Sequence, residues 1–292
     1  MRTGQESIES WVGDVEFERV GLVKRAIKTV LINPFANYAP AGMLKSLLRF
    51  GKSELAAANW ADPGGWRSMV ISYHGRPRQI ADKILVGGGS MAIALRNRRR
   101  LASRILAALI EHAPSEPVEV LCLGAGPGHI IMDALCQVRR AAHATLVDLS
   151  GDAFEYGRQL ARELGLEQKV RFVQGDVRDI RTMLDRPPHV VKMLGICEYL
   201  DDEHIVGIAR AVAEVMDERG SIVFNDLSDR HGTDRFFRRV FGLHMKHRTA
   251  RQLCDLFGQA GFDEFDQTAE PLGVYRVIVA HRESRANRTS KG

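Results

Sequence analysis

The stretch VLCLGAGPGHI, residues 120–130, decides the fold. Its first letters predict a short buried strand, its glycines predict a tight turn, and a helix is expected to begin at His129. Glycine is needed where a strand turns sharply into a helix, because a Cβ would clash with a ligand or with the helix backbone. Twenty residues beyond Gly128, Asp148 ends the next apolar run, ATLVD. This spacing predicts a nucleoside-binding α/β domain in which Asp148 accepts the ribose hydroxyls.

Strands and helices alternate from about residue 117 onward. Strands are predicted near 118–123, 143–148, 169–174, 189–194, 220–225 and 273–281. Apolar residues at helical spacing predict helices at 151–164 and after Leu200. The last strand follows a hairpin-like stretch, 262–272, rather than a helix. We therefore expect an α/β fold with a doubly wound, mostly parallel, seven-stranded sheet whose last strand is antiparallel.

The first 110 residues differ from the rest and predict a mainly helical region. Apolar side chains between Val20 and Leu31 fall on one helical face, and Pro34 is expected to end that helix. A second helix is predicted near 43–48, and a basic helix near 91–112. We expect residues 1–110 to form a helical cap that covers the substrate, and residues 111–292 to form the nucleoside-binding domain.

Composition places the chain among globular proteins of a reducing compartment. At 45% hydrophobic, its 292 residues can bury a core. The four cysteines have neither CxxC nor zinc-site spacing, so no disulfide framework is predicted. The N-terminal sequence has no apolar signal region, and no apolar run reaches the roughly 20 residues that cross a bilayer. We expect a cytoplasmic protein.

Four motifs follow successive strands in one order. They are the G-x-G-x-G turn after the first strand, Asp148-Leu149-Ser150 after the second, Gly175-Asp176 after the third, and Gly195 to Leu200 after the fourth. Over residues 95–282 this order resembles class I S-adenosylmethionine-dependent methyltransferases. The dinucleotide fingerprint G-x-G-x-x-G would place its third glycine at 129, where the chain has His129, and it does not need Gly175-Asp176. The resemblance therefore implies a Rossmann-like domain that binds S-adenosylmethionine and carries catalysis.

The resemblance also implies which residues hold the cofactor. The glycines of the turn pass its methionine part, Asp148 holds the ribose, Asp176 accepts the adenine amino group, and the Val177 N–H meets the ring. Arg96 or Arg98 could pair with its carboxylate. The cofactor-binding set is expected to be Gly124, Ala125, Gly126, Gly128, Asp148, Leu149, Gly175, Asp176, Val177, Gly195 and Arg98. Two alternatives stay open at this point: the aspartates could be helix N-caps, and the arginines could form a solvated basic face.

Candidate catalytic residues lie after the fourth and fifth predicted strands. Methyl transfer needs orientation and a dry site, and a hydroxyl or ammonium acceptor also needs a general base. The candidates are Glu198, Tyr199 and His231, with Asp226 also at a suitable strand end. Alternatively, Tyr199 packs over the cofactor, Glu198 caps or pairs, and His231 is a surface residue. The histidines and acids lack metal-ligand spacing, so we expect no metal in the reaction.

Two features bear on the methyl acceptor. Enzymes that methylate the exocyclic amines of nucleic-acid bases resemble one another in an N-P-P-Y type motif after the fourth strand. This chain has GICEY there, so a nucleic acid is disfavoured as the methyl acceptor. Residues 19–52 hold seven basic side chains and no acidic one among apolar residues. Such a segment can lie on an anionic membrane surface, or it can be a cap helix with ordinary snorkelling lysines.

We therefore expect a methyltransferase that acts on an O or N atom of a small or amphiphilic, lipid-like acceptor, with peripheral membrane contact through 19–52. An aminopropyl or aminocarboxypropyl transferase on the same fold is the alternative, because such enzymes attack a different carbon of the same sulfonium. A protein that binds the cofactor without turnover is a third hypothesis.

Overall fold

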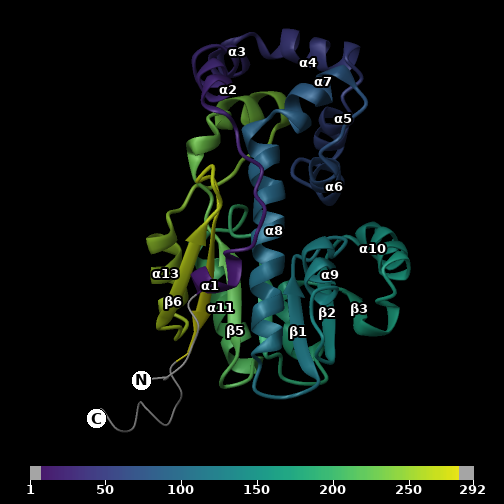
Figure 1. Ribbon diagram of the computed structural model, residues 1–292, viewed down its shortest axis with the longest axis vertical. Helices are drawn as coiled ribbons and strands as arrows, with labels where there is room; N and C mark the ends of the chain where they lie inside the picture. Colours follow the sequence, from purple (N-terminus) through teal and green to yellow (C-terminus); the bar gives the residue numbers. More distant parts are fainter. Residues whose placement is uncertain (1–7, 283–292) are drawn as a thin grey trace.

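The computed structural model describes residues 8–282, and its centre is a seven-stranded sheet (Figure 1). The strand order is β3-β2-β1-β4-β5-β7-β6. The five neighbouring strands β3, β2, β1, β4 and β5 are parallel to one another, and β7 is antiparallel to both β5 and β6. The strands are β1 Val118–Leu123, β2 Ala142–Asp148, β3 Val170–Gln174, β4 Val190–Met193, β5 Ser221–Asn225, β6 Glu264–Ala269 and β7 Arg276–His281. The predicted fold class is confirmed, and the hairpin-like stretch contains β6.

Helices cover both faces of the sheet because β1, β2, β4 and β5 are apolar on both sides. One face packs against α1 (Ile8–Val12), α8 (Ser90–Glu111), α9 (His129–Leu135) and α10 (Gly151–Glu163). The other face packs against η4 (Val177–Thr182), α11 (Asp202–Val215) and α13 (Ala250–Gly258).

A helical cap stands at one end of the sheet, above the carboxyl ends of its parallel strands (Figure 1). Its elements are α2 (Leu22–Ile27), η1 (Lys28–Ile32), α3 (Asn33–Tyr38), α4 (Ala41–Phe50), α5 (Glu54–Ala61), α6 (Trp66–His74), α7 (Ile80–Asp82) and η2 (Lys83–Gly87). The expectation that Pro34 ends the first cap helix is wrong. Helical backbone continues from Leu22 to Tyr38, because Pro34 occupies the first turn of α3, directly after the π-helical turn η1, where a missing N–H is tolerated.

The cap is built from two separate parts of the chain. Residues 229–241, which form η5 (Asp229–His231), α12 (Asp234–Phe236) and η6 (Phe237–Phe241), pack into it. Leu44, Leu48 and Ala56 share one buried cluster with Phe236 and Val240. The long helix α8 connects cap and sheet, since its first turns pack below the cap and its later turns enter the sheet core. The division at residue 110 stays a prediction, and to it the structure adds this second cap segment.

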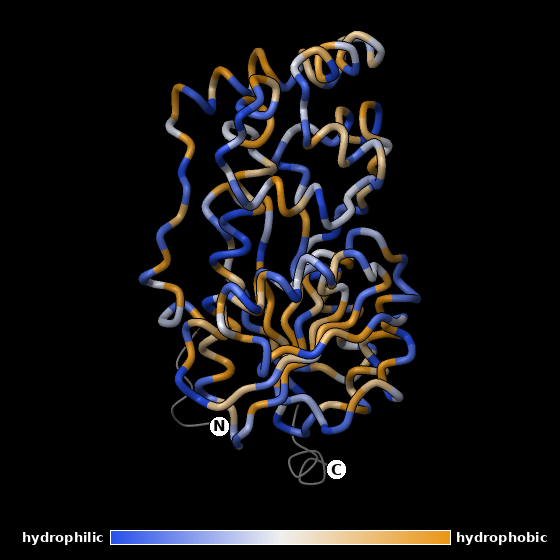
Figure 2. Tube along the Cα trace, turned by 90° about the vertical axis from the view of Figure 1, so that its right-hand side faces the viewer, coloured by the Kyte–Doolittle hydropathy of each residue, from blue (hydrophilic) through white to orange (hydrophobic). Residues whose placement is uncertain are grey.

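The outer cap helices expose apolar side chains, which Figure 2 shows as orange stretches on the outermost coils. Leu22 is 84% exposed and Phe50 is 90% exposed, and Val23, Val30, Leu31, Phe35 and Leu47 are exposed as well. Within residues 8–282, no helix is long and apolar enough to span a membrane.

Candidate active site

The glycine turn after β1 has the backbone that its sequence predicts. Gly124, Gly126 and Gly128 all have positive φ, at 54°, 53° and 88°. A Cβ on Gly124 would lie 2.3 Å from Ile196 Cγ2, and a Cβ on Gly128 would lie 2.4 Å from Leu146 Cδ2. Both positions therefore require glycine for conformation and for space.

Asp148, at the end of β2, holds this turn in place. Its Oδ2 accepts a hydrogen bond from the Gly126 N–H at 2.7 Å, and its Oδ1 accepts one from the Ser150 N–H at 2.9 Å. The carboxylate thus joins the loops that follow β1 and β2. It also lines the cavity beside them.

That cavity, cavity I, has a volume of about 300 Å³ and lies at the carboxyl ends of β1, β2 and β4. Ligands of open α/β sheets bind at this edge. Nine of the predicted site residues line it: Gly124, Ala125, Gly126, Gly128, Asp148, Gly195, Arg98, Glu198 and Tyr199. The cap supplies the opposite wall through α5, α6 and η6, with Leu55, Asn59, Trp66, Tyr73 and Phe241.

Helix α6 lies directly over the glycine turn. A Cβ on Gly126 would come within 3.7 Å of Trp66 Cβ. Arg67, next along α6, forms an ion pair of 2.7 Å with Asp152 in the first turn of α10. His129, at the start of α9, stacks on Tyr156 with ring centroids 5.7 Å apart. Burial, with the nearby charge of Arg99, lowers the pKa of His129 to about 3, so the His129 ring is uncharged at neutral pH.

The floor of cavity I carries buried charges. Arg98 Nη1 lies 3.7 Å from Glu198 Oε1, and the Arg98 guanidinium stacks 4.5 Å above the ring of Tyr275. Lys192, on β4, is also buried and points its Nζ toward the Gly124 carbonyl at 3.4 Å. Burial lowers the pKa of Lys192 and raises that of Glu198, while Arg98 opposes the shift of Glu198.

Two polar atoms of this cluster have capacity left for a ligand. Arg98 Nε and Glu198 Oε2 are buried and have no hydrogen-bond partner among the described residues. Both side chains line cavity I. An unpaired buried donor or acceptor costs about 1–3 kcal/mol, so the cavity favours a polar ligand that satisfies them.

Tyr199 also faces the cavity. Its side chain is 43% exposed, and a Cβ on Gly64 of the cap would lie 2.7 Å from its hydroxyl oxygen. Burial of the hydroxyl, with the charge of Glu198, raises its pKa above the usual range. The phenol is therefore protonated at neutral pH and can donate a hydrogen bond.

Five predicted site residues lie outside the lining of cavity I: Leu149, Gly175, Asp176, Val177 and His231. Asp176 acts as the N-cap of η4, since its Oδ1 accepts from the Arg178 N–H at 2.9 Å. The Arg178 side chain also pairs with it and, mainly by this hydrogen bonding, lowers the pKa of Asp176 to about 2. Its proposed contact with adenine stays a prediction.

His231 is buried and lies outside the lining of cavity I. Its Nδ1 lies 3.0 Å from Thr233 Oγ1, and its ring packs on the edge of Phe237 at 5.8 Å. Burial lowers its pKa to about 4. It packs inside the second cap segment, so the geometry gives no support to a catalytic role. Asp226 is likewise engaged, accepting from the Arg276 N–H at 2.6 Å.

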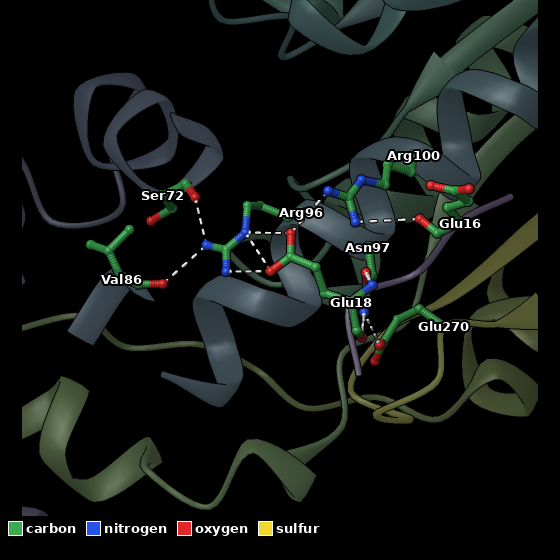
Figure 3. Close-up of polar contacts among 8 residues, drawn as sticks. All are labelled: Glu16, Glu18, Ser72, Val86, Arg96, Asn97, Arg100 and Glu270. Carbon is green, nitrogen blue, oxygen red and sulfur yellow. Dashed lines mark hydrogen bonds and ion pairs between the residues drawn. The ribbon is translucent and has the colours of Figure 1, made fainter. Parts of the chain in front are cut away.

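Arg96 has a structural task instead of a cofactor contact, as Figure 3 shows. Its guanidinium pairs with Glu18 at 2.6 Å and donates to the carbonyls of Ser72 and Val86, each at 3.0 Å. Asn97, beside it on α8, exchanges two hydrogen bonds with the Glu18 backbone. The solvated-face interpretation is wrong for Arg96 and Arg98, because both are buried.

Several lining residues escaped the sequence analysis. Lys192 left a detectable signal, since a lysine interrupts the apolar run VVKML of a predicted buried strand. His129, Trp66 and Tyr275 left none, because their approach depends on tertiary packing. Across residues 8–282, no group of three or more His, Cys, Asp or Glu side chains is placed to hold a metal ion.

Comparison with known proteins identifies the family. Residues 81–282, more than two thirds of the chain, match the model of a family described as "Putative methyltransferase". The chain belongs to this methyltransferase family.

Sequence relatives and solved structures are more distant. The chain is 23% identical over 233 residues to the uncharacterized protein YnbC of Escherichia coli K12, a match that covers 74% of this chain and 40% of YnbC. A 64-residue stretch is 38% identical to the ubiquinone/menaquinone biosynthesis C-methyltransferase UbiE of a Bradyrhizobium strain, which covers 22% of this chain and 25% of UbiE. The chain thus spans well under half the length of these curated relatives.

Among solved structures, magnesium protoporphyrin IX methyltransferase of Synechocystis PCC 6803 with bound S-adenosylhomocysteine matches with a TM-score of 0.56 and 15% identity. That match covers 82% of this chain and 99% of the other. The pyocyanin biosynthetic protein PhzM matches with a TM-score of 0.52 and 18% identity, and covers 84% and 74%. These likenesses concern the fold, which is that of class I methyltransferases.

Proposed function

We propose that the protein transfers the methyl group of S-adenosylmethionine to an oxygen or nitrogen atom of a small or amphiphilic acceptor. The observation that carries this is the composition of cavity I. In one space it combines the glycine turn, Asp148, and the buried cluster of Arg98 and Glu198, with an apolar wall contributed by the cap. Family membership and the solved methyltransferase with bound S-adenosylhomocysteine support the same cofactor.

The residues present fit this cofactor. Arg98 Nε, a buried donor with no partner among the described residues, suits the carboxylate of its methionine part. We assign the ribose hydroxyls to Asp148, and the position of its carboxylate in the cavity lining beside the glycine turn supports this assignment. S-adenosylmethionine supplies a methyl group on a positively charged sulfonium, which needs no further activation.

The chain's own residues then have three tasks. Trp66 and the rest of α6 cover the glycine turn and exclude water. Tyr199 donates a hydrogen bond that orients the acceptor. Glu198 takes the proton that a hydroxyl loses as it attacks, or that an ammonium loses to become the attacking amine. Burial raises the pKa of Glu198, so its proton affinity lies closer to neutral pH than that of an exposed glutamate.

The first experiment is calorimetric titration of the protein with S-adenosylmethionine, S-adenosylhomocysteine and NAD. Micromolar binding of the first two and no binding of NAD is the expected result. Binding of NAD alone would overturn the cofactor assignment. Product mass in an acceptor screen then separates the alternatives, because methylthioadenosine in place of S-adenosylhomocysteine would show an aminopropyl or aminocarboxypropyl transferase.

The Glu198→Gln variant tests whether Glu198 is the general base. Glu203→Gln is the matched control, because Glu203 is exposed on α11. We expect Glu198→Gln to lower kcat by roughly 10²–10⁴-fold while S-adenosylhomocysteine still binds. Tyr199→Phe is expected to raise KM more than it lowers kcat. Unchanged turnover in Glu198→Gln would assign the glutamate to cofactor binding alone.

The proposal includes peripheral contact with anionic membranes through residues 19–52. Support comes from the exposed apolar side chains of α2 to α4 beside Lys24, Arg25 and Lys45. Each basic residue near such a surface contributes about 1 kcal/mol. Co-sedimentation with anionic liposomes at low salt, against neutral liposomes, tests this contact, and failure to sediment with either would remove it from the proposal.

A further inference from the structure

A second and larger cavity lies inside the cap. Cavity II has a volume of about 1090 Å³, more than three times that of cavity I. It lies between the outer helices α2 to α4 on one side and α7, η2 and the start of α8 on the other. Apolar side chains dominate its lining, among them Ile32, Phe35, Leu44, Leu47, Leu48, Ile84 and Ile93.

The charged residues around cavity II are almost all basic. Arg19, Lys24, Lys28, Lys52 and Arg78 line it. The acid among its lining residues is Glu18, and this carboxylate is held by Arg96 at 2.6 Å and by Arg100 at 3.0 Å. Burial, with the charge of nearby Lys24, also lowers the pKa of Lys28. The cavity therefore offers an apolar interior with net positive charge, which suits an anionic amphiphile.

The two cavities meet at a thin wall. Leu85, Met91 and Phe237 line both of them. The three side chains are apolar, and methionine is the most adaptable of core residues because it is unbranched and has three rotatable bonds. Met91 Sδ accepts a hydrogen bond of 3.4 Å from the hydroxyl of Tyr275, the ring on which Arg98 stacks. One side of the wall thus contacts the buried cluster of cavity I, and the other side faces the apolar cavity.

We propose that cavity II holds the hydrocarbon chain of the methyl acceptor, a lipid-like amphiphile whose reacting group lies in cavity I and whose negative charge lies among the basic residues around cavity II. This inference rests on the proposed function and names its substrate class. The chain passes between Leu85, Met91 and Phe237, and its end lies among the side chains of α2 to α4 that line cavity II. Burying each methylene group contributes about 0.8 kcal/mol, so chain length sets affinity.

The test uses n-alkyl phosphates from hexyl to dodecyl as non-reacting probes, each below its micelle concentration, in the presence of S-adenosylhomocysteine. With the wild-type protein we expect the Kd to fall by roughly two- to fourfold for each added methylene group. The decisive pair of variants is Ile32→Glu and Leu31→Glu. Both side chains are apolar and exposed on the same helical turn, yet Ile32 lines cavity II and Leu31 does not.

A tail site predicts that Ile32→Glu weakens dodecyl phosphate binding at least tenfold, while Leu31→Glu leaves it within twofold of wild type. Equal behaviour of the two variants would overturn the inference and assign the probe to nonspecific surface adsorption. Thermal unfolding of each variant, and its affinity for S-adenosylhomocysteine, report whether the fold and cavity I are intact. The two proposals can fail independently. Failure of the wild-type protein to bind S-adenosylhomocysteine would overturn the proposed function, whereas the alkyl phosphate results test cavity II.

A photoreactive group at the chain end gives a second readout that needs no variant. Dodecyl phosphate with a terminal diazirine is expected to label the lining of cavity II, around Leu44, Leu47 and Ile93. Labelling confined to cavity I, or to side chains outside both cavities, would overturn the inference. The remaining alternative is that a second copy of the chain occupies cavity II. Analytical ultracentrifugation of the protein without ligand tests it. A dimer that dissociates in the Ile32→Glu variant would assign cavity II to the second copy and overturn the inference.

Discussion

The sheet and the outer cap use apolar residues in opposite ways. In β1, β4 and β5 nearly every side chain is buried, and Phe224 on β5 stacks on Phe257 with ring centroids 3.8 Å apart. In α2, η1 and α3 no residue is buried, although apolar residues make up much of the sequence. The sheet uses its apolar side chains for stability, whereas the outer cap leaves them available for a ligand or a surface.

The largest expected effect comes from deleting an aromatic side chain on the sheet side of this comparison. Phe224→Ala should lower the free energy of unfolding by about 3–5 kcal/mol, because it leaves a cavity beside Phe257. Chemical denaturation followed by circular dichroism measures it. A loss below about 1 kcal/mol would mean that the sheet core repacks freely, and the contrast with the cap would fail.

A smaller effect is expected at the edge where sheet and cap meet. Asp148→Ala should weaken S-adenosylhomocysteine binding roughly ten- to a hundredfold, because it removes the acceptor for the ribose and leaves the Gly126 N–H unpaired. Calorimetry measures this change. Asp185→Ala is the matched control, since that carboxylate is 84% exposed and lies outside cavity I. Similar affinities for the two variants would contradict the assignment of Asp148.

Acidic pH should lower the free energy of unfolding through one buried histidine beside the sheet and one in the cap. His129 and His231 have pKa values lowered by burial to about 3 and about 4, whereas an unfolded histidine titrates near 6.5. Between pH 6.5 and about 4 the unfolded chain binds more protons, so stability falls as pH falls. Each histidine adds at most about 1.4 kcal/mol per pH unit to this slope. Melting temperatures should fall across this range, and less steeply for His231→Gln; identical slopes would contradict a buried neutral His231.

The smallest effect is expected in the outer cap. Phe50→Ala should change the free energy of unfolding by less than about 0.5 kcal/mol, because the side chain is 90% exposed. The same variant should reduce sedimentation with anionic liposomes. A loss of stability comparable to that of Phe224→Ala would show that Phe50 packs in solution, and the comparison between the two regions would have to be withdrawn.

The sheet was predictable because its signals are local. The glycine turn and the alternation of strands with helices both lie within short stretches of sequence. Eight of the nine predicted residues that line cavity I end or follow β1, β2 and β4, because parallel strands bring their carboxyl ends to one edge, whereas Arg98 comes from α8.

The cap was less predictable because its contacts join distant parts of the chain. His231 follows β5 as expected, yet it packs inside the second cap segment and does not line cavity I. Pro34 suggests a helix end, but the π-helical turn before it allows the helix to continue. The pairing of Arg96 with Glu18 spans 78 positions, and no local pattern reveals it.

The two-part cap constrains how this protein can be recombined with its relatives. The family match begins at residue 81, so most of the first cap segment, residues 22–87, lies before it and the second, 229–241, lies within it. A chimaera that exchanged residues 18–87 alone would replace the packing partners of Phe236 and Phe241 and the counter-charge of Arg96. We therefore expect a transplanted cap to keep its packing only when both segments travel together, as one unit drawn from two places in the gene.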